Sequence, residues 1–275
     1  MNAVWILAAK ELRDGLRNRW VAASVLLLAA FALLLALVGS APVGAVRADP
    51  LEVNVVSLAS LSVYLLPLIA LMVAYDSLVG EFERGTMLLL LTYPVARWQV
   101  VIGKFLGHTM ILGLAVGLGY GGVALAVLAL GEGGAAGWQA YLTMMGSSLL
   151  LGTVFLALGY GVSVVVRERA TAAGLALGLW LLFVVLYDLA LLGLLLADQR
   201  QRIGQTLFAS LMVINPTDAY RILNLTGAEG VAQLAGMSGV AARAGLGLWT
   251  LWGTLLFWLV APLGFTLWRF QKREL

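Results

Sequence analysis

Residues 76–104, DSLVGEFERGTMLLLLTYPVARWQVVIGK, form a charged segment between two long apolar runs. The segment places six charged side chains in a sequence that is otherwise suited to lipid. These are Asp76, Glu81, Glu83, Arg84, Arg97 and Lys104. Such an interruption is typical of the part of an integral membrane protein that faces a partner in the cytoplasm.

The composition of the whole chain indicates a membrane protein. Of its 275 residues, 62% are hydrophobic and 11% are charged, whereas about 25% are charged in a typical soluble domain. A helix needs about 20 apolar residues to cross the hydrocarbon core. We predict an all-α membrane protein with one domain over residues 1–275 and six transmembrane helices, at residues 21–38, 55–75, 105–130, 141–166, 171–196 and 246–267.

An even number of spans places both termini on one side. Most of the 17 Lys and Arg residues flank the spans on that side, so we predict that both termini are cytoplasmic. The net charge of +3 requires no nucleic-acid partner. Aromatic residues at predicted span ends agree with this topology: Trp20, Trp138, Tyr141, Trp249, Trp252 and Trp268.

Two further segments are expected outside the spans. Residues 1–19 form an amphipathic pattern that predicts an interfacial elbow helix, either a topological anchor or a contact for a partner subunit. Residues 197–245 should contain short outer helices, one of them beginning at the pair Asn215-Pro216. This outer segment is expected to pack over the bundle as a lid or to bind an external protein.

Residues 76–104 themselves are expected to fold as a helical hairpin. The first helix should stop at Tyr93, because the residue before a proline is disfavoured in the α conformation. A second helix should start at Pro94, with Arg97 and Lys104 able to reach phosphates or water. The tip of this hairpin would be residues 81–85.

The same segment resembles the intracellular signature of ABC-2 type permeases, the six-helix membrane subunits of one group of ATP-binding cassette transporters. The resemblance implies a homodimer in the bacterial inner membrane, in contact with lipid, that binds two cytoplasmic ATPase subunits. Residues 91–98 and 215–221 are most similar to a branch of the family that acts in copper-enzyme maturation with a periplasmic partner. The residues implied in coupling to the ATPase are Glu81, Phe82, Glu83, Arg84, Gly85, Thr86, Met87, Pro94, Arg97 and Lys104.

No catalytic site is expected in this chain. Gly103-Lys104 lacks the preceding glycine and the following hydroxyl of a phosphate-binding loop. ATP and magnesium should therefore be bound by the partner ATPase. His108 is the only histidine and no metalloprotease or serine-hydrolase motif occurs, which argues against a membrane hydrolase.

Four residues inside the spans are candidates for other roles. Gly113, Gly117 and Gly121 form a small-residue face suited either to packing within the chain or to dimerisation. Asp188 is the one carboxylate well inside a predicted span, and it is a candidate for function or for a hydrogen bond across helices.

The sequence predicts no metal site and leaves the cargo open. Soft metals prefer clusters of thiolate, thioether or imidazole, but the chain has no cysteine. The weak candidates are His108, Met144 and Met145, so relaying motion to a periplasmic partner fits better than carrying copper, and a sulfur species stays open. The alternatives are an exporter of another small or lipid-like substrate, or a self-contained carrier that uses Asp188.

Overall fold

The computed structural model describes residues 3–39, 50–129, 134–197, 204–225 and 247–273, and within these ranges all regular secondary structure is helical, as predicted. The elements are α1 Ala3–Arg17, α2 Arg19–Gly39, α3 Pro50–Ala74, α4 Val79–Glu83, α5 Thr86–Thr92, α6 Arg97–Ala129, α7 Ala135–Val165, α8 Arg169–Leu181, the π-helix η1 Leu182–Leu186, α9 Tyr187–Ala197, α10 Gln205–Ile214, α11 Pro216–Leu225 and α13 Leu248–Gln271.

The described residues contain five helical stretches that are long and apolar enough to cross a membrane. The pair α1 and α2, which is bent by 75°, provides a sixth candidate. All six predicted spans therefore correspond to helices. The largest difference is at α6, which begins at Arg97 rather than near residue 105, so the second arm of the predicted hairpin and the third span are one continuous helix.

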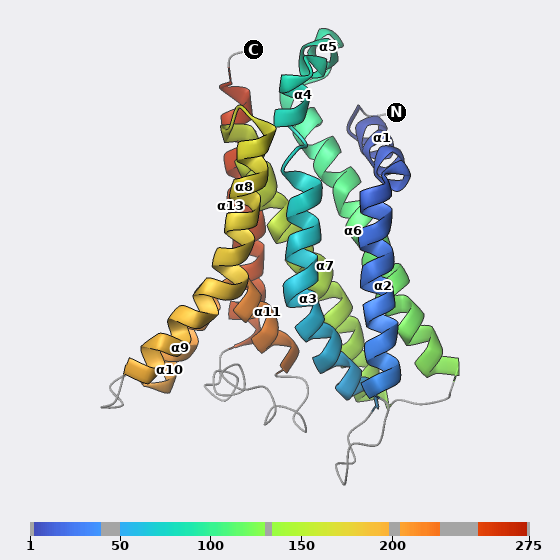
Figure 1. Ribbon diagram of the computed structural model, residues 1–275, viewed down its shortest axis with the longest axis vertical. Helices are drawn as coiled ribbons and strands as arrows, with labels where there is room; N and C mark the ends of the chain where they lie inside the picture. Colours follow the sequence, from blue (N-terminus) through green and yellow to red (C-terminus); the bar gives the residue numbers. More distant parts are fainter. Residues whose placement is uncertain (1–2, 40–49, 130–133, 198–203, 226–246, 274–275) are drawn as a thin grey trace.

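Both chain ends lie at the same end of the helix bundle, together with α1, α4 and α5 (Figure 1). This arrangement agrees with an even number of spans. The cytoplasmic location of this end stays a prediction from the basic residues. The predicted N-terminal helix is present as α1, and its position at the membrane interface also stays a prediction.

The core of the bundle is built around α3 and α7, which pack closely. A Cβ on Gly159 of α7 would lie 2.5 Å from the Cβ of Ala74 on α3, so the glycine permits this close approach. Tyr141 was expected at the membrane interface, and that depth stays a prediction. Its ring is buried, and its hydroxyl donates to the carbonyl oxygen of Tyr120 at 2.7 Å.

The described part of the outer segment contains the short helices α10 and α11, and α11 was predicted to begin at Asn215-Pro216. The prediction is confirmed, because the amide of Thr217 donates to Asn215 Oδ1 at 3.1 Å and closes the first turn. Helix α11 packs against α3, α7 and α13, with Tyr220 and Ile222 fully buried. The rest of the predicted outer segment lies mainly outside the described residues.

Candidate functional site

The charged segment forms two short helices rather than one arm of a hairpin. Helix α4 ends at Glu83 and α5 begins at Thr86. Gly85 lies between them with a φ of 71°, in the left-handed region that a residue without a Cβ adopts readily. Tyr93 is extended before Pro94, as expected, and α6 then begins at Arg97.

We call residues 83–93 the α4–α5 tip, because α5 projects beyond the neighbouring helices at this end (Figure 1). Its surface combines charged and apolar side chains. Leu88 is 52% exposed, and Leu89 and Tyr93 are each 67% exposed. Glu83, Arg84 and Thr86 are also exposed. Large apolar side chains gathered beside charges at a projecting tip are typical of a protein interaction site.

Residues 78–83, which we call the base of the tip, are hydrogen-bonded to two spans. The amides of Leu78 and Val79 both donate to Ser163 Oγ of α7 at 3.0 Å. Glu83 Oε1 accepts a hydrogen bond from the amide of Arg169, at the start of α8, at 2.7 Å. The tip is therefore fixed to α7 and α8 although its outer surface is free.

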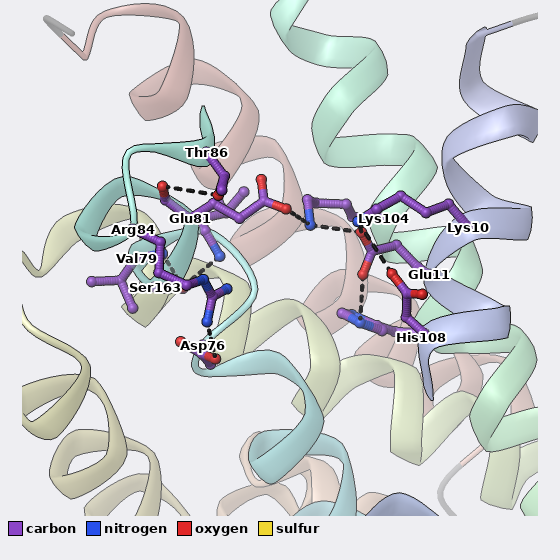
Figure 2. Close-up of polar contacts among 12 residues, drawn as sticks. Lys10, Glu11, Asp76, Val79, Glu81, Arg84, Thr86, Lys104, His108 and Ser163 are labelled. Carbon is purple, nitrogen blue, oxygen red and sulfur yellow. Dashed lines mark hydrogen bonds and ion pairs between the residues drawn. The ribbon is translucent and has the colours of Figure 1, made fainter. Parts of the chain in front are cut away.

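A buried ion cluster joins the base of the tip to α1 and α6 (Figure 2). Lys104 Nζ lies 2.8 Å from Glu11 Oε1 and 2.7 Å from Glu81 Oε1, and only 3% of the lysine side chain is exposed. His108 Nε2 lies 3.5 Å from Glu11 Oε2. We name Glu11, Glu81, Lys104 and His108 the buried ion cluster.

The positions of two cluster members differ from the expectation. Lys104 was expected to reach phosphates or water, and Glu81 to lie on the outer tip, but both are buried and paired with each other. The sequence of α6 alone does not show that α1 packs over the face of α6 that carries Lys104. Burial acts to raise the pKa of Glu11, but its hydrogen bond with His108 and the charge of Lys104 outweigh burial and hold this pKa well below its ordinary value.

Two glycines of α6 allow α1 to lie this close. A Cβ on Gly103 would be 2.7 Å from Leu7 Cβ, and one on Gly107 would be 2.6 Å from Glu11 Cβ and 2.7 Å from the carbonyl oxygen of Ala8. Sequence reasoning did not identify this contact. The sequence feature that could have indicated it is the spacing of four residues between the two glycines, which places both on one face of the helix.

A cavity of about 670 Å³ lies beside the buried ion cluster and is bordered by α1, α2, α3 and α6. Its wall changes from charged residues near the cluster to apolar residues on the spans. The residues that line it include Lys10, Asp14, Asp76, Arg84 and Arg169, and also Val21, Ile69, Met72, Val73 and Ile111. In this wall Arg169 Nη2 donates to Asp76 Oδ2 at 2.8 Å.

The other residues implied in coupling are mostly structural. Met87 is buried, and Thr86 Oγ1 donates to the carbonyl oxygen of Glu81 at 3.3 Å. Phe82 packs edge-on against Phe270 of α13, with ring centroids 6.1 Å apart. Arg97 Nη1 donates to the carbonyl oxygens of Phe270, Gln271 and Arg273, so it fixes the start of α6 to the end of α13.

Asp188 lies in a contact across helices, one of the two roles that the sequence left open for it. It forms an ion pair with Arg221 of α11, which also binds Asp218 Oδ1 at 2.8 Å. The nearby π-helix η1 presents the carbonyl oxygen of Phe183 to α11. That oxygen accepts hydrogen bonds from Asn215 Nδ2 at 2.8 Å and Thr217 Oγ1 at 3.0 Å. Sequence reasoning had no signal for the π-helix.

The weak metal candidates lie in different surroundings. His108 belongs to the buried ion cluster, while Met144 of α7 is buried and its sulfur accepts a hydrogen bond from Ser148 Oγ at 3.5 Å. Met145 is half-buried at the next position of α7. Within the described part of the chain, no group of three or more His, Cys, Asp or Glu residues could hold a metal ion.

The small-residue face of α6 does not pack within the described chain. A Cβ added to Gly113, Gly117 or Gly121 would meet no atom within 4 Å. Packing against another described helix, one of the two interpretations of this face, is therefore not observed at these three positions. Its use in a dimer stays a prediction.

Comparison with known proteins identifies relatives over most of this structure. A family model described as "ABC-2 family transporter protein" matches residues 5–275. A protein of Pseudomonas aeruginosa named "Probable ABC transporter permease protein NosY" is 51% identical over 225 residues, covering 81% of this chain and 82% of the relative. A protein of Stutzerimonas stutzeri with the same name is 49% identical and covers 81% of each chain.

Proposed function

The chain belongs to the ABC-2 family of transporter proteins, and we propose that it is the membrane subunit through which a separate cytoplasmic ATPase drives motion across the bilayer. The observation that carries this proposal is the α4–α5 tip, which has a free apolar surface and a fixed base. A free surface suits a partner, and a fixed base passes the partner's displacement to the spans.

The contacts at the base support a route for this displacement. Movement of α4 acts on α7 through Ser163, on α8 through the amide of Arg169, and on α6 and α1 through Lys104 and Glu11. Most of these contacts are buried hydrogen bonds and ion pairs, several of them to charged groups, so they resist separation when the tip is displaced. Four helices would therefore respond together.

The chemistry of ATP hydrolysis would belong to the partner. Lys104, the lysine of the Gly-Lys pair, is buried between two carboxylates and is not available to bind phosphates. Magnesium and ATP would be held by the ATPase, two copies of which would bind a homodimer of this chain. The end of the bundle that carries both termini would face the cytoplasm of a bacterial cell.

We further propose that the complex acts in the maturation of nitrous oxide reductase, with a NosF-like ATPase and a NosD-like periplasmic protein. The support is 49–51% identity to two proteins named as NosY permeases. Because the chain has no cysteine and Met144 is buried, its side chains favour transmission of motion to the periplasmic partner over direct passage of copper.

The coupling role is tested by replacing the two exposed leucines of the tip. The tagged chain is purified from membranes after co-expression with its neighbouring genes. With the variant Leu88→Ser/Leu89→Ser, the amount of ATPase that co-purifies should be at least about tenfold lower than with the wild type. Burial of one leucine contributes about 1.5–3 kcal/mol, and about 1.4 kcal/mol is a tenfold change in affinity. Leu207→Ser, a similarly exposed leucine of α10 at the other end of the bundle, is the matched control (Figure 1).

The maturation role has a separate test. A bacterium that makes nitrous oxide reductase but lacks this chain should accumulate the reductase with reduced copper content. Expression of the wild-type chain should restore the copper content, whereas expression of the tip variant should not. Full copper loading in the absence of the chain would contradict this role without affecting the coupling proposal.

A further inference from the structure

A second cavity at the same end of the bundle has four basic residues among the six that line it. It has a volume of about 500 Å³ and lies where α4, the end of α7 and the end of α13 meet. No acidic residue of the described chain lines it. Its lining consists of Phe82, Val165, Arg167, Arg269, Lys272 and Arg273, and we call it the basic pocket.

One wall of the basic pocket is held rigidly. Arg273 Nη1 donates to the carbonyl oxygen of Val164 at 2.8 Å, and Nη2 donates to that of Val166 at 3.2 Å. The guanidinium carbon lies 4.1 Å from the centre of the Phe82 ring. A cation fixed by two carbonyls and an aromatic face is a preformed element of a binding site rather than a mobile surface charge.

The charges of the basic pocket are not compensated within the described residues. Arg167 and Arg269 form no ion pair there, in contrast to Arg169, which binds Asp76. Glu168 follows Arg167 in sequence but accepts a hydrogen bond from Thr171 Oγ1 of α8 at 3.4 Å. Burial, together with the charges of Arg269 and Arg167, lowers the pKa of Arg273. An anion between these side chains would relieve their mutual repulsion.

The neighbouring tryptophan indicates the depth of the pocket in a membrane. Trp268 is 52% exposed, and Lys272 Nζ lies 4.5 Å from the centre of its ring. Tryptophan is enriched at the level of the lipid headgroups, and basic pockets at the cytoplasmic ends of transmembrane helices suit anionic headgroups. Trp268 therefore favours a position of the pocket at the level of the lipid phosphates.

We propose that the basic pocket binds the headgroup of an anionic phospholipid of the cytoplasmic leaflet. The phosphate would lie between Arg167 and Arg269, with Arg273 behind it. Phe82 of α4 forms part of the same pocket, so the lipid would contact the helix that carries the tip. This inference does not depend on which ATPase or periplasmic protein the chain binds.

Native mass spectrometry of the full chain tests this proposal, with phosphatidylglycerol and phosphatidylcholine titrated in detergent. The variant Arg167→Gln/Arg269→Gln should bind phosphatidylglycerol about 30-fold more weakly, which corresponds to about 2 kcal/mol for two basic residues. Binding of phosphatidylcholine should not change. The matched control is Arg13→Gln/Arg17→Gln, which removes the same charge from the exposed side of α1 at the same end of the bundle.

Four results would overturn the proposal. Equal phosphatidylglycerol affinity in the variant and the wild type would exclude the pocket as the site, and equal losses in both double variants would show only a general effect of charge. If millimolar inorganic phosphate displaced the lipid and bound the pocket as tightly as the lipid does, the pocket would be a site for free phosphate. If the pocket variant instead kept its lipid and lost the co-purified ATPase, the pocket would receive acidic side chains of that partner.

Discussion

At the residue scale, Lys104 is the group on which the buried ion cluster depends. Lys104→Met would leave Glu11 and Glu81 buried without their shared cation, and removal of one partner from a buried pair costs about 3–5 kcal/mol. We expect a clear fall in the thermal unfolding midpoint, which is measured by tryptophan fluorescence. Lys10→Met is the control, because Lys10 is half-exposed and its pairs should contribute about 0–1 kcal/mol. Equal effects of the two substitutions would contradict a special role for Lys104.

Asp218 gives the outer end of the bundle a predicted pH dependence. Burial raises the pKa of Asp218 to about 7, the charge of Asp188 acts in the same direction, and Arg221 opposes both. Because the folded pKa lies above the ordinary value of 3.8, the folded chain holds a proton that the unfolded chain releases. Stability should therefore fall as pH rises from about 4 to about 7, by up to about 1.4 kcal/mol per unit, and should then level off.

The measurement is the unfolding midpoint of the purified chain between pH 5 and 8. Asp218→Asn should remove most of the decline, whereas Asp14→Asn, an exposed acid of α1, should leave it unchanged. A decline of the same slope in Asp218→Asn and wild type would show that other groups cause it.

Residue-level predictions from sequence succeeded where the cause is local. The effect of Pro94 on Tyr93 depends on neighbouring atoms alone, and the extended conformation of Tyr93 was predicted. The placement of Lys104 depends on α1, a helix more than 80 residues earlier, and was predicted wrongly. For Asp188 a bond across helices was one of two interpretations, but its partner, Arg221, was not predicted because it comes from a separate outer helix.

At the element scale, the contact between α1 and α6 depends on two glycines. Gly107→Ala would place a Cβ 2.7 Å from the backbone oxygen of Ala8, so α1 must move. We expect a loss of about 1–3 kcal/mol, as for overpacking in a core, and weaker coupling of the tip to α1. Gly117→Ala is the matched control on the same helix, since its Cβ would meet no atom within 4 Å and alanine favours a helix by about 1 kcal/mol.

The comparison is made by the unfolding midpoint of the two variants under one set of conditions. A lower midpoint for Gly107→Ala with an unchanged or higher one for Gly117→Ala agrees with the structure. Two equal losses would mean that the helix face at Gly117 is also closely packed.

The elements themselves were largely readable from hydropathy, because each span must satisfy its own backbone hydrogen bonds in lipid. All six predicted spans correspond to helices, and α11 begins where Asn215-Pro216 predicted. The break at Gly85 and the π-helix η1 were not anticipated. The π-helix depends on how a neighbouring segment uses a freed backbone group, as Asn215 and Thr217 do at Phe183.

At the scale of the whole molecule, the structure divides into a tip that is free to bind and a bundle that is fixed to its base. The residues implied in coupling fall into both parts, with Glu83, Arg84 and Thr86 exposed and Glu81, Met87 and Lys104 buried. Sequence resemblance identified the segment but not this division. Under the proposed coupling role, the exposed residues contact the ATPase, and the buried ones pass its motion to α1 and α6.

Site-directed cross-linking tests this division most directly. The natural chain has no cysteine, so Leu89→Cys creates a unique attachment point for a photoreactive cross-linker on the tip. We expect a covalent adduct with the co-expressed ATPase in membranes from Leu89→Cys, and none from Leu207→Cys of α10. If Leu89→Cys gives no ATPase adduct while the ATPase still co-purifies, or if both positions react equally, the α4–α5 tip is not the coupling surface.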